Sequence, residues 1–302
     1  MSAGWFLTAR PIVCDSAPWF SAGQETSDAF KETETFYPPM CLIIFAHQAE
    51  SRYPLVLAAN RDEFFARPTE QAGFWQVQPN QSNAQQILAG RDLLAGGTWL
   101  GITRSGRFAA VTNIRDPSQS EQKSRSRGEL TREFLASTQS AQEYGESLVQ
   151  HFSKFAGFNL LIGDGESLYY ANNFEHVVWR LEPGIYGLSN GLLNTPWPKV
   201  ERGKERLKEI LGSNHHITTD KLIELMADRK RASDDELPDT GVPAELEKTL
   251  SSAFILNKER LYGTRCSTAI VIDAEGETCF SEQNYDSFGE TAEQHTYNVT
   301  LA

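Results

Sequence analysis

The sequence lacks several features that would place it in a large, familiar class of protein. It has no apolar run of the length that a transmembrane helix needs, so no membrane span is expected. The net charge is −12, and the nearest approach to a basic cluster, residues 123–127, is typical of a solvated loop. Nucleic acid and anionic membrane surfaces are therefore not expected partners. A hydrophobic content of 40% indicates a globular chain with a sizeable core.

Cysteine is also scarce. The chain has four, Cys14, Cys41, Cys266 and Cys279, with none of the close pair spacings of a zinc site and too few for a disulfide scaffold. This usage favours a reducing, intracellular setting, so the predicted location is cytoplasmic. No metal and no other cofactor is expected, and the sequence gives no signal for an oligomeric state.

The first 39 residues lack a sustained hydrophobic period and end in two prolines. They also lack the charged start, apolar centre and cleavage site of a signal peptide. We expect residues 1–39 to be either a disordered leader or sequence that precedes the true start at Met40, and residues 40–302 to form a single domain. With Met40 as the start, removal of the methionine would leave Cys41 as the first residue.

The stretch from Met40 to Glu63 predicts two adjacent strands joined by a polar turn. Apolar runs cover 41–46 and 54–59, and the second leads directly into Asn60-Arg61-Asp62-Glu63. In an antiparallel pair the end of the second strand lies beside the start of the first. The charged cluster should therefore lie near Cys41.

The remaining pattern predicts strands, two helices, strands, several polar helices and a final hairpin over STAIVID and ETCFSEQ. Residues 64–84 are predicted to be a loop because they contain Pro68 and Gly73. Segregated elements of this kind favour an antiparallel α+β protein over alternating β-α-β units. Helices numerous enough to cover two sheets suggest a four-layer αββα sandwich.

Several motifs resemble those of the NRDE family, also called transport and Golgi organisation protein 2. They are the Met40-Cys41 start, the NRDE tetrad at 60–63, GGTWLGI at 96–102, VTNIRDP at 111–117, LSNGLLNTPWPKV at 188–200 and YGTRCSTAIVID at 262–273. The resemblance covers nearly all of the chain from Met40 onward. It implies an αββα fold of the N-terminal nucleophile hydrolase kind, similar to choloylglycine hydrolases and penicillin V acylases.

The resemblance also implies site residues. Cys41 falls on the nucleophile and Asp62 on the aspartate that holds the terminal amine. Asn113 and Asn190 fall on two asparagines that stabilise the oxyanion, and Arg265 falls on a late arginine that could bind a substrate carboxylate or pair with Asp62. We also predict that the substrate contacts Asn60, Arg61 and Trp99.

One position departs from the pattern of those acylases, which carry Arg immediately before an Asn-x-Asp. Here Ala59 precedes Asn60-Arg61-Asp62. Because successive side chains of a strand point to opposite faces, Arg61 should lie on the face opposite Asp62 unless the backbone bulges.

A terminal cysteine has chemistry suited to attack on amides. Its thiol has a reference pKa of about 8.5 and its α-amine one of about 7.7–8.0, so the amine can accept the thiol proton near neutral pH. Asparagine side chains can then donate to the oxyanion, and one such donor typically lowers the barrier by about 2.7–4 kcal/mol.

Two functions from different classes follow. The first is a hydrolase that cleaves a small-molecule amide through an acyl-thioester at Cys41. The second is a non-catalytic binding or trafficking protein on the same fold, with haem or an acyl-CoA or lipid ligand. Taken without the resemblance, Cys41 could be an ordinary buried strand cysteine, and Arg61 with Asp62 a surface ion pair.

Overall fold

The computed structural model describes residues 40–301, apart from 78–84, 116–121 and 214. Residues 1–37 lie outside the described residues. The leader predicted over residues 1–39 therefore falls outside them as well.

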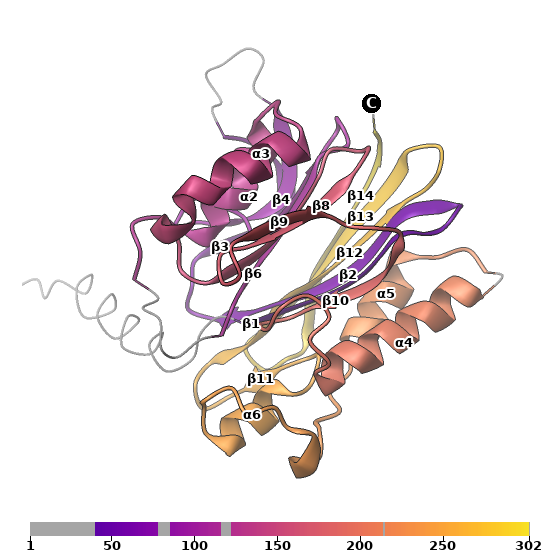
Figure 1. Cartoon of the computed structure of the whole chain (residues 1–302). Helices are drawn as coiled ribbons and strands as arrows, with labels where there is room; N and C mark the ends of the chain where they lie inside the picture. Colours follow the sequence, from indigo (N-terminus) through magenta and orange to yellow (C-terminus); the bar gives the residue numbers. More distant parts are fainter. Residues whose placement is uncertain (1–39, 78–84, 116–121, 214, 302) are drawn as a thin grey trace, which may run out of the picture. The chain divides into compact units, whose positions relative to one another are not determined.

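The first sheet has seven strands in the order β10-β1-β2-β12-β13-β14, with β11 paired to β12 (Figure 1). The strand pairings within this sheet are antiparallel. Its strands are β1 (Met40–Glu50), β2 (Tyr53–Phe64), β10 (Gly184–Leu188), β11 (Leu256–Asn257), β12 (Tyr262–Ile272), β13 (Glu277–Tyr285) and β14 (Thr291–Thr300).

The second sheet also has seven antiparallel strands, in the simple order β3-β4-β5-β6-β7-β8-β9. They are β3 (Thr69–Gln76), β4 (Gln86–Asp92), β5 (Leu100–Thr103), β6 (Phe108–Asn113), β7 (Phe158–Gly163), β8 (Leu168–Asn172) and β9 (Val177–Arg180).

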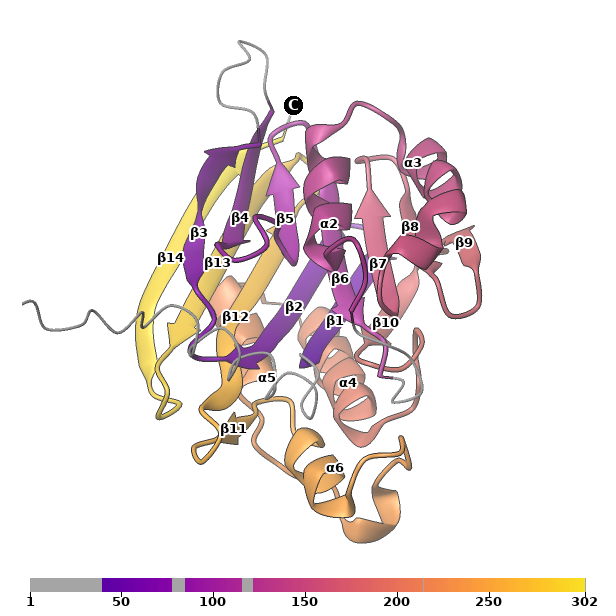
Figure 2. The ribbon, with the colours of Figure 1, turned by 90° about the vertical axis from the view of Figure 1, so that its left-hand side faces the viewer.

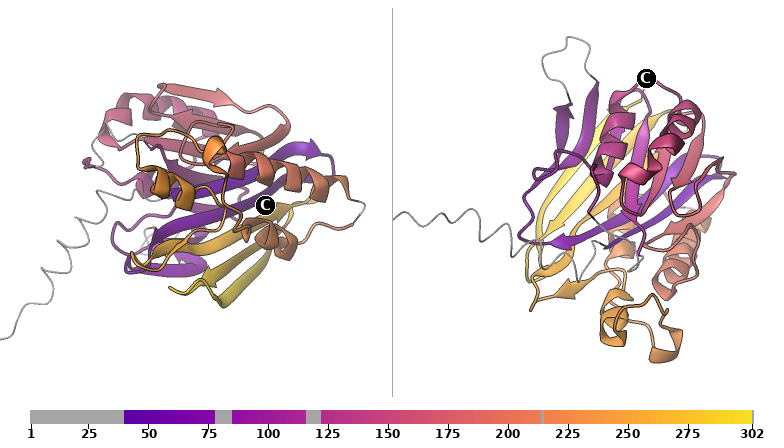
Figure 3. Two further views of the ribbon diagram at one scale, coloured as in Figure 1. Left: turned by 90° about the horizontal axis from the view of Figure 1, so that it is seen from below. Right: turned by 60° about the vertical axis from the view of Figure 1, so that its left-hand side comes forward.

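Helices cover the outer face of each sheet, as Figures 2 and 3 show. On the second sheet lie α2 (Arg127–Ala136) and α3 (Ala141–Leu148), the latter continued by a 3₁₀ turn over Val149–Lys154. On the first sheet lie α4 (Pro198–Gly212) and α5 (Thr219–Met226), while the short α6 (Ala244–Leu250) reaches residues near the start of β1.

Three apolar cores separate these layers. One lies between the sheets, a second between the first sheet and α4 and α5, and a third between the second sheet and α2 and α3. The predicted four-layer αββα sandwich is therefore confirmed. Both sheets and all three cores lie within residues 40–301.

Strand β1 is central and illustrates why the sequence takes this form. Its run of apolar residues is unbroken because both faces are covered, with Ile43 and Phe45 toward the other sheet and Leu42 and Ile44 toward the helices. Gly203 of α4 lies directly on Ile44, where an added Cβ would come within 2.7 Å of the isoleucine side chain. This close approach fixes α4 against β1.

Two predictions about elements were wrong. Residues 64–84 contain β3, whose irregular pairing between Glu70 and Gly73 obscures the strand period. The chain also continues past the predicted final hairpin into β14, an edge strand whose residues are mostly exposed. Edge strands that bury little apolar surface leave a weak hydrophobic pattern.

Candidate functional site

The site forms where β1 begins and β2 ends. Met40 pairs with Asp62, and Cys41 pairs with Arg61 in the antiparallel register. The predicted proximity of the charged tetrad to Cys41 is thus confirmed. Arg61 in turn pairs with Cys266 of β12, so two cysteines flank one arginine across three strands.

The tetrad divides between the two faces of the first sheet. Asn60 and Asp62 lie on the face that α4 and α5 cover, and Arg61 and Glu63 lie on the face toward the second sheet. This alternation matches the face predicted for Arg61. All four side chains are buried, and within the described part of the chain no ion pair joins Arg61 to Asp62. The alternative of a surface ion pair is therefore wrong.

Cys41 is buried on β1 between two strands. The Ser189 hydroxyl, next to β10, donates to the Cys41 carbonyl at 2.9 Å. Burial, and secondly the nearby Asp62 carboxylate, raise the pKa of the thiol to about 12, while Arg61 acts in the opposite direction. With Met40 attached, the thiol is therefore protonated at neutral pH.

Met40 is fully buried and fills the space beside Asp62. Its backbone N–H donates to the Tyr262 hydroxyl at 2.8 Å. Its sulfur accepts from Nη2 of Arg115 at 3.1 Å. The residue before Cys41 is thus held on both sides by polar groups of the site.

Asp62 has one oxygen bonded and one without a partner. Oδ1 accepts a hydrogen bond from the Thr264 hydroxyl at 2.6 Å. Oδ2 is buried and has no hydrogen-bond partner within the described part of the chain. Burial raises the pKa of this carboxyl, and the ammonium of Lys199 opposes that rise. Asp62 therefore has an acceptor oxygen available for a cationic donor.

Asn113 and Asn190 are joined by hydrogen bonds. Nδ2 of Asn190 donates to the carbonyl of Asn113 at 3.2 Å and to its Oδ1 at 2.6 Å. The β1–β10 pairing ends at Ile43 and Leu188, and the hydroxyl of Ser189, the residue before Asn190, donates to the Cys41 carbonyl at 2.9 Å. The structure therefore brings together Cys41, Asp62, Asn113 and Asn190.

The two asparagines have different hydrogen-bonding states. The bond to the Asn113 carbonyl fixes the amide orientation of Asn190, because a carbonyl can only accept. Oδ1 of Asn113 must then be an acceptor, and its Nδ2 is left buried without a partner in the described residues. Asn113 thus has a free donor, whereas Asn190 positions it.

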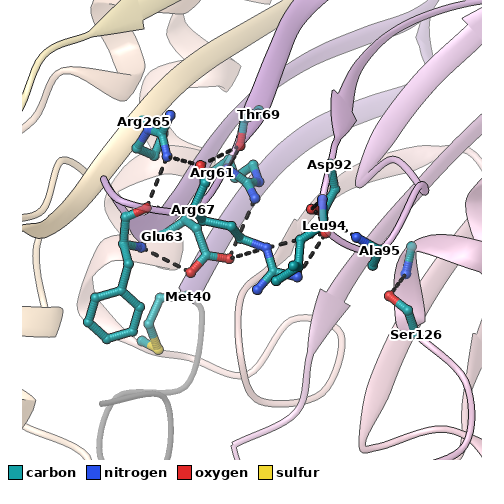
Figure 4. A network of polar contacts seen from close by, with 12 residues as sticks. Met40, Arg61, Glu63, Arg67, Thr69, Asp92, Leu94, Ala95, Ser126 and Arg265 are labelled. Atoms are coloured by element: carbon teal, nitrogen blue, oxygen red, sulfur yellow. Dashed lines mark hydrogen bonds and ion pairs between the residues drawn. The ribbon is translucent and has the colours of Figure 1, made fainter. Parts of the chain in front are cut away.

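Arg265 belongs to a second polar network, drawn in Figure 4. It sits at the irregularity in the β2–β12 pairing and donates to the carbonyls of Phe64 and Arg67 at 2.9 and 3.0 Å. Glu63 lies 3.5 Å from Arg61 and 3.6 Å from Arg67. Arg265 therefore contacts backbone oxygens in place of the pairing with Asp62 that the sequence suggested.

Asn60 is part of the scaffold. Its Nδ2 donates to the carbonyls of Met226 and Ala253 at 2.8 and 2.9 Å, and its Oδ1 accepts from Ser267 at 2.6 Å. These bonds occupy both amide hydrogens, so the side chain has none left for a substrate. The predicted substrate contact is replaced by a structural role that joins β2 to α5 and to the chain before β11.

Replacing Asn60 with alanine is expected to lower the free energy of unfolding by about 2–4 kcal/mol, because two buried carbonyls lose this partner and the Ser267 hydroxyl keeps only Tyr285. Urea unfolding of the purified protein measures the change. Asn298→Ala on the exposed edge strand β14 is the control, with an expected change within about 0.5 kcal/mol. Equal free energies of unfolding for the two variants would contradict the structural role assigned to Asn60.

A pocket of about 380 Å³ lies beside Asn190. Its lining is Ile114, Arg115, Phe174, Asn190, Gly191, Leu192, Trp197, Asp239 and Thr240. Trp99 is not among these residues; it packs against the apolar cores on both faces of the second sheet. Trp197 rather than Trp99 therefore forms the aromatic wall nearest the site.

Sequence reasoning missed four buried polar residues that surround the site. They are Arg115, Lys199, Tyr262 and Thr264. Lys199, in the first turn of α4, has an almost fully buried side chain whose Nζ donates to the Leu250 carbonyl at 2.9 Å. Burial lowers its pKa, and Asp62 opposes that effect. Each of the four lies within one of the family motifs, and that position was the only sign in the sequence of a role at the site. Their hydrogen-bond partners are distant in sequence, so the contacts themselves could not be predicted.

Two further observations limit the kinds of site present. Among the described residues, no three His, Cys, Asp or Glu side chains are placed to share a metal ion. No helix in the same part of the chain is both long and apolar enough to cross a bilayer.

The fold and the site together define an αββα sandwich with a buried cysteine at the head of a central strand. The chain belongs to the Transport and Golgi organisation 2 family, whose model matches residues 40–287. The mouse (Mus musculus) Transport and Golgi organization 2 homolog is 36% identical over 283 residues, covering 87% of this chain and 99% of that protein. The human (Homo sapiens) homolog is 36% identical over 281 residues, with the same coverage. The Drosophila melanogaster protein is 28% identical, covering 85% and 97%.

Two solved structures resemble the chain weakly. A mutant conjugated bile acid hydrolase from Clostridium perfringens is 12% identical, with a TM-score of 0.40, and the match covers 85% of this chain and 96% of that one. A Caenorhabditis elegans ortholog of N-acylethanolamine-hydrolyzing acid amidase is 12% identical, with a TM-score of 0.42, covering 76% and 92%.

Proposed function

We propose that this protein hydrolyses the carbon–nitrogen bond of a small-molecule amide, with Cys41 as the nucleophile. One observation carries the proposal: near Cys41, two buried polar atoms have no hydrogen-bond partner among the residues that the structure describes. Oδ2 of Asp62, an acceptor, belongs to β2, and Nδ2 of Asn113, a donor, is held by Asn190 beyond the end of β10. A nucleophile with a terminal amine needs an acceptor for the amine and a donor for the oxyanion.

The proposal includes the start of the active chain. Met40 fills the space beside Asp62, and a chain that begins at Cys41 would carry its α-amine opposite Asp62 and Arg61. The family match begins at residue 40, which supports residues 40–302 as the functional domain and residues 1–39 as a segment outside it.

The proposed reaction uses these groups in order. The α-amine accepts the thiol proton, and Oδ2 of Asp62 accepts a hydrogen bond from the resulting ammonium. The thiolate sulfur forms a bond to the amide carbon, and Nδ2 of Asn113 donates to the oxyanion. The ammonium then returns a proton to the departing amine as the C–N bond breaks, which leaves an acyl-thioester. Water, activated by the free amine, cleaves this ester and regenerates the thiol.

The test is the rate at which iodoacetamide alkylates each cysteine between pH 6 and 10, followed by peptide mass spectrometry. Burial raises the pKa of both Cys41 and Cys266 when Met40 is present, so both should react slowly at pH 7 and faster only as the pH rises. In protein that begins at Cys41, we expect Cys41 to react at least about tenfold faster than Cys266 at pH 7. Equal rates in that protein would count against the nucleophile.

The pocket also favours one form of the binding alternative. Its wall includes Ile114, Phe174, Leu192 and Trp197, which suit an apolar chain, and the described residues of its lining include no His, Cys, Met or Tyr to ligate haem iron. An acyl or lipid ligand is therefore better supported than haem. Binding of such a ligand should survive Cys41→Ala, whereas hydrolysis should not.

A further inference from the structure

Arg115 lies at the junction of the pocket and the site, and the two edges of its guanidinium differ. The side chain is only 3% exposed. On one edge, Nη1 donates to the Thr240 hydroxyl and to Glu247, both at 2.8 Å. On the other edge, Nη2 contacts the sulfur of Met40, and Nε has no partner within the described part of the chain.

The second edge has the geometry of an anion site. The Nε–H and Nη2–H groups of a guanidinium point the same way and match the two oxygens of a carboxylate. A thioether is a weak acceptor, and a buried donor without a partner costs about 1–3 kcal/mol. This edge therefore gains more from a carboxylate than from its present contact with Met40.

Arg115 is also tied to the reacting groups. It follows Asn113 by two residues, and its backbone N–H donates to the Asn190 carbonyl at 2.8 Å. A group bound at its guanidinium is therefore held at a fixed position relative to the proposed oxyanion donor. Its ring neighbour, Trp197, lies 5.3 Å from the guanidinium carbon and forms the pocket wall.

The charges around Arg115 also favour an anion at its guanidinium. Arg115 and Lys199 both lie over the ring of Trp197. The negative charge of Glu247 neutralises that of Arg115 through a direct ion pair. In the proposed active chain, the negative charge of Asp62 neutralises the terminal ammonium. Lys199 forms no ion pair with a carboxylate among the described residues, so the net positive charge of this region favours binding of an anion.

We propose that Arg115 binds a carboxylate of the substrate, in the space that Met40 occupies, and so selects amides that carry a carboxylate, as N-acyl amino acids do. This inference rests on the proposed hydrolase function for its catalytic consequence, and on the geometry of Arg115 alone for its binding consequence.

The experiment compares hexanoylglycine with its neutral analogue hexanoylglycinamide, using protein translated from Met40 alongside the full chain. We expect kcat/KM to favour hexanoylglycine by about 10- to 100-fold, the range of a charged hydrogen bond. Arg115→Gln alone would leave the buried Glu247 carboxylate without its cationic partner, so the test variant is Arg115→Gln combined with Glu247→Gln. It should lose the preference while changing the rate on hexanoylglycinamide less than threefold.

Two variants separate charge recognition from structural damage. Glu247→Gln alone keeps the guanidinium and should keep the preference for the anion. Arg202→Gln removes a partly exposed ion pair to Asp228 on the outer face of the first sheet and should leave both rates unchanged. A double variant that still prefers hexanoylglycine would overturn the role of Arg115.

Calorimetric binding to the Cys41→Ala protein distinguishes this inference from the hydrolase proposal. Suppose that neither amide is cleaved, that hexanoylglycine binds more tightly than hexanoylglycinamide, and that the Arg115 double variant abolishes this difference. The carboxylate-binding role of Arg115 would then be supported and the hydrolase function would be contradicted. If both amides are cleaved at equal rates and bind equally, the hydrolase stands and the anion site does not.

Discussion

Replacing Cys41 with alanine is expected to lower the rate of amide hydrolysis by about 10⁴-fold or more, the usual consequence of removing a nucleophile. The effect should be that large because Asn113, Asp62 and the pocket can orient an amide but cannot attack it. The measurement is kcat for an amide that the unaltered protein cleaves, with burst-phase detection of the acyl-thioester. The burst should disappear together with turnover.

Cys266 provides a closely matched control. It lies on β12 directly across Arg61 from Cys41, is buried to the same 6% exposure, and also has a raised thiol pKa because of burial. Cys266→Ala should therefore cost a similar amount of stability while keeping kcat within about threefold of the unaltered protein. If the two alanine variants lost activity equally, the effect would belong to packing around Arg61 and the nucleophile assignment would fail.

Replacing Asn113 with alanine is expected to lower kcat by about 10²–10³-fold with little change in KM, because a free donor at the oxyanion acts mainly in the transition state. Its Nδ2 has no partner in the described residues, and Asn190 would lose its bond to Oδ1 but keep its bond to the Asn113 backbone carbonyl, so the expected loss of stability is only about 1 kcal/mol. The measurement pairs steady-state kinetics with urea unfolding on the same preparation.

Asn190→Ala provides the contrast for that prediction. Asn190 donates to both oxygens of Asn113, so its loss should lower the free energy of unfolding by about 1–3 kcal/mol as well as the rate. Asn113→Ala with unchanged kcat would show that the oxyanion donor is another group.

Local pattern was enough to predict the centre of the site. Two apolar runs separated by a short polar turn leave one simple antiparallel pairing, and that pairing sets Cys41 opposite Arg61. Strand alternation likewise placed Arg61 and Asp62 on opposite faces. These features depend on neighbours in sequence, where the period of two and the turn length determine the geometry.

Contacts between distant segments could not be predicted in the same way. Lys199 reaches the Leu250 carbonyl, and Arg115 pairs with Glu247, through packing that brings α4, α6 and the end of β6 together. The hydrophobic periodicity of the sequence does not determine which distant segments pack together. Asn113 and Asn190 differ in role because the side-chain amide of Asn190 donates to both oxygens of Asn113. This orientation depends on the three-dimensional structure and cannot be predicted from the sequence.

The central claim, that Cys41 acts with a free α-amine, is tested most directly by the intact mass and N-terminal peptide of protein purified from its native source. The account predicts a mature chain that begins at Cys41 with an unmodified amine. A purified, active protein that retained Met40 would contradict it. Met40 would still fill the space beside Asp62, and the nitrogen of Cys41 would be a peptide amide, which cannot accept the thiol proton.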